Sequence, residues 1–400
     1  MKLSSPNANL AVLVIAQLLA LSLWFSLNAI APQLKVELGF SNNELSLLSL
    51  AVQLGFVAGG LLFAFTNAPD IFKTKNFFAA SAFLAAAANF ASSTQSSFIV
   101  LLALRFLTGF FLAGVYPTGM KLAATWFKEN RGFAIGLIVA ALTLGSGLPY
   151  LFNLSGVPDW RVVLNASTLL AVAAGLLVLL FVQEGPFGGV LAKFDLGKVK
   201  QIASNRAMRL AAFGYFGHMW ELYAMWVWIP VFLRDSFSAG GFDAIFYSSL
   251  GAFLVFLAGA FATGFGGRIA DKLGRTKFNI ALLAASGACC LLIGFLFNSP
   301  FAALAVAIVW GIAVIPDSPQ YSAMASELSE KAYVGTALAL QTAVGFFITI
   351  FSIRLIPIVL EKVGWHYAFA VLALGPLFGI ASLLALRKEP DATKIAGGRK

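Results

Sequence analysis

Twelve long runs of apolar residues dominate this chain of 400 residues. An α-helix needs roughly 20 such residues to cross the hydrocarbon core of a bilayer. Only 11% of the residues are charged, which is too few to cover globular domains in water. We therefore predict an all-α integral membrane protein with spans at about 8–31, 45–65, 76–94, 97–119, 132–153, 161–182, 209–233, 244–266, 278–297, 301–326, 333–357 and 365–386.

The longest polar connection lies near the middle of the chain and holds Gly185, Pro186, Gly188 and Gly189. Glycine and proline in such a stretch are typical of a linker. We predict an N-terminal six-helix bundle at 1–183, a linker at 184–208 and a C-terminal six-helix bundle at 209–400. The first run is longer than the apolar part of a signal peptide and is followed by Pro32, so we interpret it as a retained helix.

Basic residues are distributed unevenly between the connections. If the twelve spans alternate in direction, most of the 27 Lys and Arg residues fall on the side of the two termini. The positive-inside rule then predicts cytoplasmic termini and a cytoplasmic linker in the inner (plasma) membrane. The net charge of +10 is thus a sign of topology in a lipid bilayer, and we expect no nucleic-acid partner.

Features of the first six runs return in the same order in the last six. The segment from Gly109 to Pro117 matches that from Gly311 to Pro319, and Trp160 matches Trp365. Since six spans separate corresponding points, the two repeats begin on the same side of the membrane. Parallel repeats of this kind are related by an axis along the membrane normal and occur in secondary transporters.

Two motifs resemble those of the major facilitator superfamily, and the resemblance covers nearly the whole chain. Arg105 is followed by Gly109, Gly114 and Pro117, and the connection after the eighth run reads Gly267-Arg268-Ile269-Ala270-Asp271-Lys272-Leu273-Gly274-Arg275. The resemblance implies two six-helix bundles around a central cavity, alternating access, and a gating loop built from Gly267, Asp271, Lys272, Gly274 and Arg275. Asp70 holds the matching place in the first half, where the rest of the motif is degraded.

The gating role has a physical basis. A carboxylate near a helix N-terminus is stabilised by about 0.3–1 kcal/mol by the helix dipole. Contacts that form in one conformation and break in the other bias the equilibrium between the two. The alternative is a charged turn that only obeys the positive-inside rule.

Glu221 and Asp317 are the two acids well inside the predicted spans. Charged groups at this depth cost a few kcal/mol, so each is a functional candidate. His218 stands three residues before Glu221, on the same helical face. We predict proton coupling by Glu221, His218 and Asp317; the alternatives are a hydrogen-bonded structural Glu221 and an Asp317 that caps the helix break next to Pro316.

Arg105 lies too deep in the fourth run to reach water easily and needs a carboxylate, carbonyl groups or a substrate anion. The seventh run is rich in aromatic residues, which favours a small organic solute with an apolar part. We predict substrate contacts by Arg105, Gln17, Trp24, Tyr116, Trp220, Tyr223, Trp226 and Gln341.

The chain lacks a Walker motif, a zinc-protease pattern and a serine-centred elbow, so we predict neither an enzyme nor a bound cofactor or metal. The hypothesis is a monomeric, proton-coupled secondary transporter of a small organic solute, with a slight preference for an organic anion. One alternative is a proton-driven exporter of drugs or metabolites, for which Gly145 to Pro149 is a partial motif. A channel, a membrane sensor and an intramembrane enzyme are alternatives from other classes.

Overall fold

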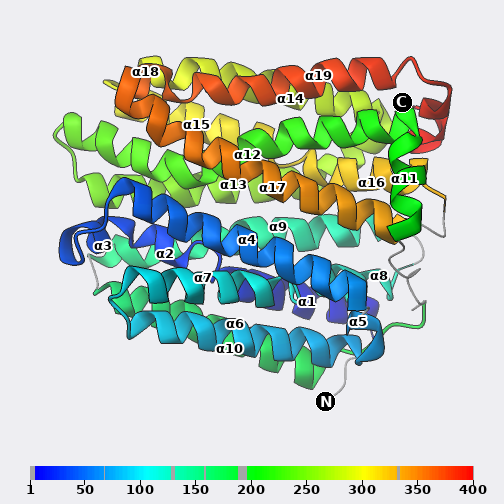
Figure 1. The fold of residues 1–400 in the computed structure, drawn as a ribbon, viewed down its shortest axis with the longest axis horizontal. Coiled ribbons are helices and arrows are strands. Elements are labelled where there is room, and N and C mark those ends of the chain that lie inside the picture. Colours follow the sequence, from blue (N-terminus) through cyan, green and yellow to red (C-terminus); the bar gives the residue numbers. More distant parts are fainter. Residues whose placement is uncertain are drawn as a thin grey trace. The chain divides into compact units, whose positions relative to one another are not determined.

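The structure is a computed structural model, in which residues 5–66, 68–127, 131–156, 159–187, 196–330 and 334–399 are described. Every regular element in these residues is a helix, so the all-α prediction is confirmed for this part of the chain. The chain divides into two compact units, Met1–Val190 and Leu191–Lys400. Figure 1 follows the helices of both units along the sequence.

Long apolar helices make up most of each unit. Within the described ranges, nine helices or helix pairs are long and apolar enough to cross a membrane: Asn42–Thr66, Phe98–Ala124, Phe133–Leu154, Trp160–Phe181, Ala244–Leu273, Arg275–Leu296, Pro300–Leu328, Val334–Val363 and Trp365–Leu386. The other three predicted spans overlap α6 (Thr74–Ser93), α12 (Arg206–Ala239) and, for the first of them, α1 (Pro6–Leu21) and α2 (Ser26–Ala29), and α1 is a shorter apolar helix. The total of twelve spans therefore stays a prediction.

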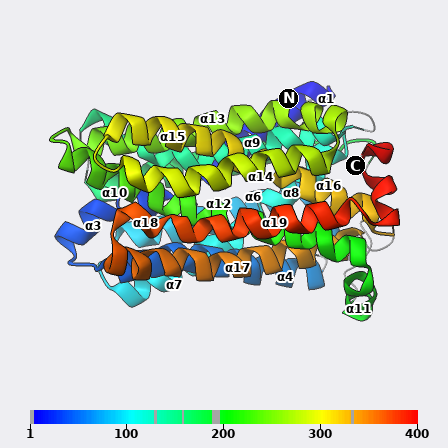
Figure 2. The ribbon, with the colours of Figure 1, turned by 90° about the horizontal axis from the view of Figure 1, so that it is seen from above.

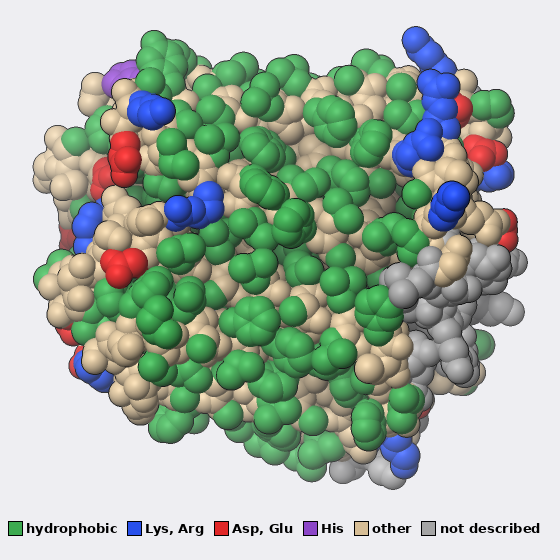
Figure 3. All heavy atoms as spheres, in the orientation of Figure 1, with side chains coloured by type: hydrophobic (Ala, Val, Ile, Leu, Met, Phe, Trp, Pro, Cys, Tyr) green, Lys and Arg blue, Asp and Glu red, His purple; other side chains and the backbone are tan. Residues whose placement is uncertain are grey.

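The surfaces of these helices are apolar. Leu169 is 70% exposed and Phe261 is 62% exposed, as are many other large apolar side chains. On the face shown in Figure 3, hydrophobic side chains cover the middle of the helices, and charged side chains gather toward their ends. Such a surface is stable in a hydrocarbon layer and not in water, which indicates a multi-pass membrane protein.

The first unit contains ten α-helices and one short 3-10 helix among its described residues. Helices α4 and α7 pack together, α6 packs on α7 and α10, and α1 packs on α9 and α10. The bounds are α1 Pro6–Leu21, α2 Ser26–Ala29, α3 Ala31–Glu37, α4 Asn42–Thr66, α5 Ala68–Ile71, α6 Thr74–Ser93, α7 Phe98–Leu112, α8 Tyr116–Ala124, α9 Arg131–Leu151, η1 Phe152–Ser155 and α10 Trp160–Phe181.

In the second unit, α12 packs on α13, α17 and α19, and the latter two lie beside it in Figures 1 and 2. The bounds are α11 Leu196–Ser204, α12 Arg206–Ala239, α13 Ala244–Leu273, α14 Arg275–Leu292, η2 Ile293–Leu296, α15 Pro300–Val314, α16 Ser318–Leu328, α17 Val334–Val363, α18 Trp365–Ala368, η4 Ala370–Ala373, α19 Leu374–Leu386 and η5 Pro390–Gly398.

Glycine permits the close contact between α4 and α7. A Cβ atom at Gly109 would lie 1.8 Å from the carbonyl oxygen of Val52, and one at Gly55 would lie 1.9 Å from that of Phe106. Small residues let two membrane helices approach until their backbones touch, which increases the van der Waals contact between them. The glycine after Arg105 in the motif thus serves helix packing.

The first predicted span is interrupted. Helix α1 ends at Leu21 and α2 begins at Ser26, so the prediction of one continuous helix over 8–31 is wrong. The break leaves the carbonyl groups of Leu23 and Trp24 without the helical partners that a continuous helix would supply. In a membrane span, such groups need partners from elsewhere in the protein.

A second break lies between α15, which ends at Val314, and α16, which begins at Ser318. Pro316 lies within it, and Pro319 is the second residue of α16. Proline has no N–H group and its ring clashes with the preceding turn, so it disrupts a helix. The disruption predicted next to Asp317 is therefore confirmed.

Candidate functional site

Glu221 lies in the long helix α12, and its side chain is fully buried. Its carboxyl group accepts three hydrogen bonds within the second unit. The hydroxyl of Ser286 donates to Oε2 at 3.0 Å, the thiol of Cys290 donates to Oε1 at 3.3 Å, and the indole N–H of Trp310 also donates to Oε1. Burial and these three donors act on the two protonation states of the carboxyl group in opposite directions.

His218 stands one turn before Glu221 and has a different partner. Its Nδ1 atom lies 2.9 Å from Oδ1 of Asp317, and both side chains are buried. The imidazole ring is also near the rings of Tyr215 and Tyr321, at centroid distances of 5.9 and 5.7 Å. Two titratable groups thus form a buried pair that is an ion pair when the imidazole is protonated.

Asp317 holds the N-cap position of α16, between Pro316 and the first helical residue. Its side chain pairs with His218 and forms no capping hydrogen bond to the described part of α16. Its role in proton coupling stays a prediction. The structure therefore brings two of the three predicted proton-coupling residues together. Glu221 is held separately, by α14 and α15.

Arg105 is fully buried in the first unit, on α7. Its Nη1 atom donates to the carbonyl oxygen of Leu23 at 3.2 Å, to Ser26 Oγ at 3.2 Å and to Asn89 Oδ1 at 3.4 Å. Its Nη2 atom donates to the carbonyl oxygen of Trp24 at 2.6 Å. The guanidinium group thus supplies the partners that the break between α1 and α2 requires.

Asn89 extends this network to a fourth helix. Its side-chain nitrogen donates to the carbonyl oxygen of Leu164 at 2.9 Å and to Thr168 Oγ1 at 3.0 Å on α10. Ser26 Oγ donates to the side-chain oxygen of Asn89 at 2.9 Å. Arg105 therefore has neutral oxygen partners. Of the three kinds of partner predicted from the sequence, the structure shows carbonyl groups. Its contact with a substrate stays a prediction.

The three aromatic residues predicted for substrate contact on α12 face different neighbours. The indole of Trp220 donates to the carbonyl oxygen of Val371, toward η4. Tyr223 and Trp226 have ring centroids 5.2 Å apart, and Phe346 of α17 lies 5.0 Å from Tyr223. Tyr223 and Trp226 thus belong to one aromatic cluster that reaches α17 and, through Trp226, α13, whereas Trp220 faces η4.

Two predicted substrate residues of the first unit lie near the helix break. Gln17 on α1 is fully buried, and neither side-chain atom has a hydrogen-bond partner among the described residues. A buried amide without a partner is costly, which leaves Gln17 a candidate for a polar ligand. Trp24 lies in the break itself, with its ring 5.0 Å from that of Phe56.

The two remaining predicted substrate residues lie on other helices. Tyr116 begins α8 and is partly buried, and Gln341 on α17 is buried.

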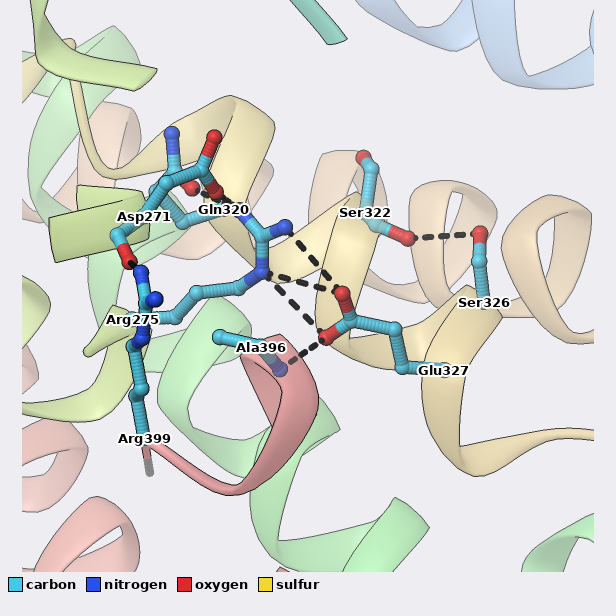
Figure 4. Close-up of polar contacts among 8 residues, drawn as sticks. All are labelled: Asp271, Arg275, Gln320, Ser322, Ser326, Glu327, Ala396 and Arg399. Carbon is cyan, nitrogen blue, oxygen red and sulfur yellow. Dashed lines mark hydrogen bonds and ion pairs between the residues drawn. The ribbon is translucent and has the colours of Figure 1, made fainter. Parts of the chain in front are cut away.

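The predicted gating loop lies where α13 meets α14, and Arg275 is the centre of its contacts (Figure 4). Its guanidinium group lies 3.1 Å from Oδ1 of Asp271, donates to Gln320 Oε1 at 2.6 Å, and binds both carboxylate oxygens of Glu327 at 3.1–3.2 Å. We call these four residues the Arg275 cluster. The two-oxygen contact with Glu327 has the fork geometry that a guanidinium forms with a carboxylate.

The C-terminal segment also contacts this cluster. The backbone N–H of Ala396 donates to Glu327 Oε2 at 3.1 Å, and the Arg399 side chain donates to the carbonyl oxygen of Asp271 at 2.8 Å. Figure 4 shows both residues beside the Arg275 cluster. The cluster therefore joins α13, α14, α16 and η5 at one end of the second unit.

The other motif residues have simpler roles. Gly274 separates the two helices at a φ of +93°, which a residue with a side chain adopts only with strain. Gly267 lies on α13 near Gln320, and Lys272 is exposed. The side chain of Asp70 lies outside the described part of the chain.

Several residues of these sites were not predicted from the sequence. Among them are Ser286, Cys290 and Trp310, because hydroxyl, thiol and indole groups are ordinary in apolar runs. Ser286 and Cys290 are four residues apart and share a helical face, but nothing local indicates that Glu221 faces them. Gln320 and Glu327, seven residues apart on α16, were missed for the same reason. No group of three or more His, Cys, Asp or Glu side chains in the described ranges could hold a metal ion.

The helices and their apolar surfaces define the class of this molecule as a multi-pass helical membrane protein. The sequence model of the Major Facilitator Superfamily matches residues 13–262 and 212–400, and the chain belongs to that family. The predicted family is thus confirmed.

Related proteins are similar to this chain at low identity. A probable sulfoacetate transporter of Cupriavidus necator is 24% identical over 276 residues, which span 64% of this chain and 63% of that protein. An MFS-type transporter of Aspergillus terreus is 28% identical over 250 residues, which span 59% of this chain and 79% of that protein. The chain therefore matches less than two thirds of the length of the first of these relatives.

Solved structures share the fold. The crystal structure of a D-xylose-proton symporter has a TM-score of 0.75 and 16% identity, with 96% of this chain and 98% of that chain covered. A partially occluded, inward-open structure of the E. coli xylose transporter has a TM-score of 0.74 and 13% identity, with 97% and 98% covered. At these identities the likeness concerns the fold alone.

Proposed function

We propose that this chain is a secondary active transporter that moves a small organic solute by alternating access and couples it to protons. The observation that carries the proposal is the carboxyl group of Glu221, fully buried in a membrane helix of a major facilitator protein and bound by three donors. An ionisable group at this depth costs a few kcal/mol, which makes such residues functional candidates. The pair formed by His218, on the same helix, and Asp317, at the start of α16, adds a second titratable unit.

The proposed substrate class is a small organic anion. The support for this class is the similarity to the protein named as a probable sulfoacetate transporter. Arg105 supports it less than its charge suggests, because its Nη atoms already donate to carbonyl and side-chain oxygens. Tyr223 and Trp226 suit the apolar part of such a solute. D-xylose, for which a structurally similar symporter is named, is the uncharged solute with which the anion is compared.

The arrangement that we propose has twelve spans in two six-helix bundles, at 1–183 and 209–400, joined by a linker at 184–208. Both termini lie in the cytoplasm, the protein is a monomer, and the membrane is the inner membrane. Asp271 and Arg275 gate the cytoplasmic side by contacts that change between conformations.

The test uses purified protein in proteoliposomes with an imposed pH gradient. Labelled sulfoacetate is expected to accumulate against its gradient when protons flow inward, and a protonophore is expected to abolish the accumulation. Labelled D-xylose is the comparison. Accumulation of D-xylose alone would refute the anion class, and proton-driven release of solute would favour the export alternative.

The variant that tests coupling is Glu221→Gln, which keeps the shape of the side chain and removes its titration. It is expected to abolish uphill transport, whereas exchange or binding of solute persists. Glu361→Gln, which alters an exposed acid on α17, is the matched control and is expected to transport normally. Full gradient-driven accumulation by Glu221→Gln would show that this residue is not the proton carrier.

A further inference from the structure

The two oxygens of the Glu221 carboxyl group have different partners. Oε1 faces the indole N–H of Trp310 and the thiol of Cys290, whereas the one donor to Oε2 among the described residues is the hydroxyl of Ser286, at 3.0 Å. The Oγ atom of Ser286 also lies 3.2 Å from the carbonyl oxygen of Leu283, one turn earlier on α14. The hydroxyl therefore has two acceptors within reach.

These partners differ in what they can do. An indole N–H group only donates, so Trp310 always needs an acceptor and disfavours a proton on the oxygen that it faces. A hydroxyl group donates and accepts, and its hydrogen rotates to suit its neighbours. A proton on Oε2 of Glu221 thus has a hydroxyl acceptor, whereas a proton on Oε1 would weaken the bond from Trp310 and meet only the weak thiol acceptor of Cys290.

We propose that Ser286 is a positioning residue that satisfies Glu221 in both of its protonation states, with the proton carried on Oε2. When Glu221 is ionised, the hydroxyl of Ser286 donates to Oε2. When Glu221 is protonated, Oε2–H donates to Ser286 Oγ, and the Ser286 hydroxyl turns to the carbonyl oxygen of Leu283. Trp310 holds Oε1 throughout. This inference rests on the proposed function and deepens it.

The exchange has a clear energetic consequence. A buried polar group that loses its partner costs far more than a typical hydrogen bond contributes. With Ser286 present, loading and unloading of the proton leave no atom of this group without a partner. The protein therefore changes the charge at Glu221 without moving α12 relative to α14.

Other titratable groups lie near Glu221 in the second unit. Cys289 and Cys290 stand on α14, Asp317 and Tyr321 on the segment that follows α15, and His218 on α12 itself. His218 is paired with Asp317. Any pH titration of this region must therefore be assigned to Glu221 by a variant.

The assay is infrared difference spectroscopy of the purified protein between acidic and alkaline pH. The pH is the only variable, and no substrate is added. The carboxyl C=O band that disappears in Glu221→Gln belongs to Glu221. Trp310→Phe removes a donor that favours the carboxylate and is expected to raise the pH midpoint of this band by about one unit, or about tenfold in proton affinity. Trp228→Phe is the matched control, since its buried indole donates to the carbonyl oxygen of Ile353, and the midpoint is expected to stay unchanged.

Ser286 is tested by a pair of variants. Ser286→Ala removes the acceptor of the protonated form and the donor of the ionised form, so both states lose one bond. The C=O band is expected to shift to the higher frequency of an acid without an acceptor, while its midpoint moves less than in Trp310→Phe. Ser286→Thr keeps the hydroxyl and is expected to restore the original band.

An unchanged band frequency in Ser286→Ala, in a variant that unfolds at the wild-type temperature, would overturn the role of Ser286. Equal midpoints for Trp310→Phe and Trp228→Phe would overturn the assignment of Oε1. Either result leaves the proposed function standing if Glu221→Gln still abolishes uphill transport. Uphill transport by Glu221→Gln would refute the proposed function even if the spectra behave as expected.

Discussion

Arg105→Lys tests whether the guanidinium group supports the helix break in the first unit. The arginine donates to the carbonyl oxygens of Leu23 and Trp24 from two different nitrogens. It also donates to Ser26 and Asn89 from Nη1. A lysine has one nitrogen in place of these two and cannot keep all of these contacts. Leu23 retains the hydroxyl of Ser26 as a donor, at 3.0 Å, so the main loss falls on the bond to the carbonyl oxygen of Trp24.

The expected cost follows from these contacts. A hydrogen bond to a charged group contributes about 1.5–3 kcal/mol, and an acceptor left buried without a partner adds a cost of its own. We therefore expect Arg105→Lys to lower the free energy of unfolding by about 3 kcal/mol, although the charge is unchanged. The measurement is thermal or denaturant unfolding of the purified protein in detergent.

Arg161→Lys is the matched control, because its side chain is 47% exposed and rests 4.2 Å from the centre of the Trp160 ring. We expect it to lower stability by less than about 1 kcal/mol. If Arg105→Lys unfolds like the wild type, the reasoning from the helix break is wrong. A variant of wild-type stability that no longer binds sulfoacetate would instead support the predicted contact between Arg105 and the substrate.

Three further predictions concern packing, gating and pH. Gly109→Ala forces a methyl group against the backbone of α4, so we expect it to lower the free energy of unfolding by several kcal/mol or to prevent folding. The control is Gly60→Ala, whose methyl group meets no atom within 4 Å, and a thermal-unfolding assay is expected to show wild-type stability for it. Asp271→Asn weakens the contact with Arg275, and we expect the protein to fold but to change its balance between inward-open and outward-open states. The measurement is chemical labelling of an introduced cysteine from each side of the membrane, and unchanged labelling from both sides would contradict the gating role. Hydrogen bonds from a neighbouring lysine and an asparagine lower the pKa of Asp391, so its small stabilising contribution is present above the unfolded pKa and is lost as the pH falls through the folded one. Unfolding temperatures of the wild type and Asp391→Asn are therefore expected to differ slightly at neutral pH and to converge in acid.

Some of this molecule could be predicted from local sequence because the physics is local. A run of about 20 apolar residues is mostly helical in a bilayer, since a single segment can satisfy its own backbone groups there only as a helix. Pro316 and Pro319 disrupt their helix by covalent geometry. The glycine of the loop motif, Gly274, ends a helix at positive φ for the same local reason.

The first helix break was not predictable in this way. Residues Ser22 to Phe25 contain neither proline nor glycine, and the run reads as one continuous span. The break persists because Arg105, more than 80 positions away, donates to the carbonyl groups that it frees. Arg105, which we predicted as a possible ligand of a substrate anion, thus binds backbone carbonyl groups whose proximity no spacing in the sequence indicates.

The same division holds for the candidate proton site. The sequence by itself determined that Glu221, His218 and Asp317 are titratable groups in apolar surroundings, because hydropathy and chain position are properties of single segments. Only the tertiary structure decided that His218 pairs with Asp317 and that Glu221 faces Ser286, Cys290 and Trp310. Such pairs depend on which faces of separate helices pack together, and helix packing is a sum of many weak contacts over the whole unit.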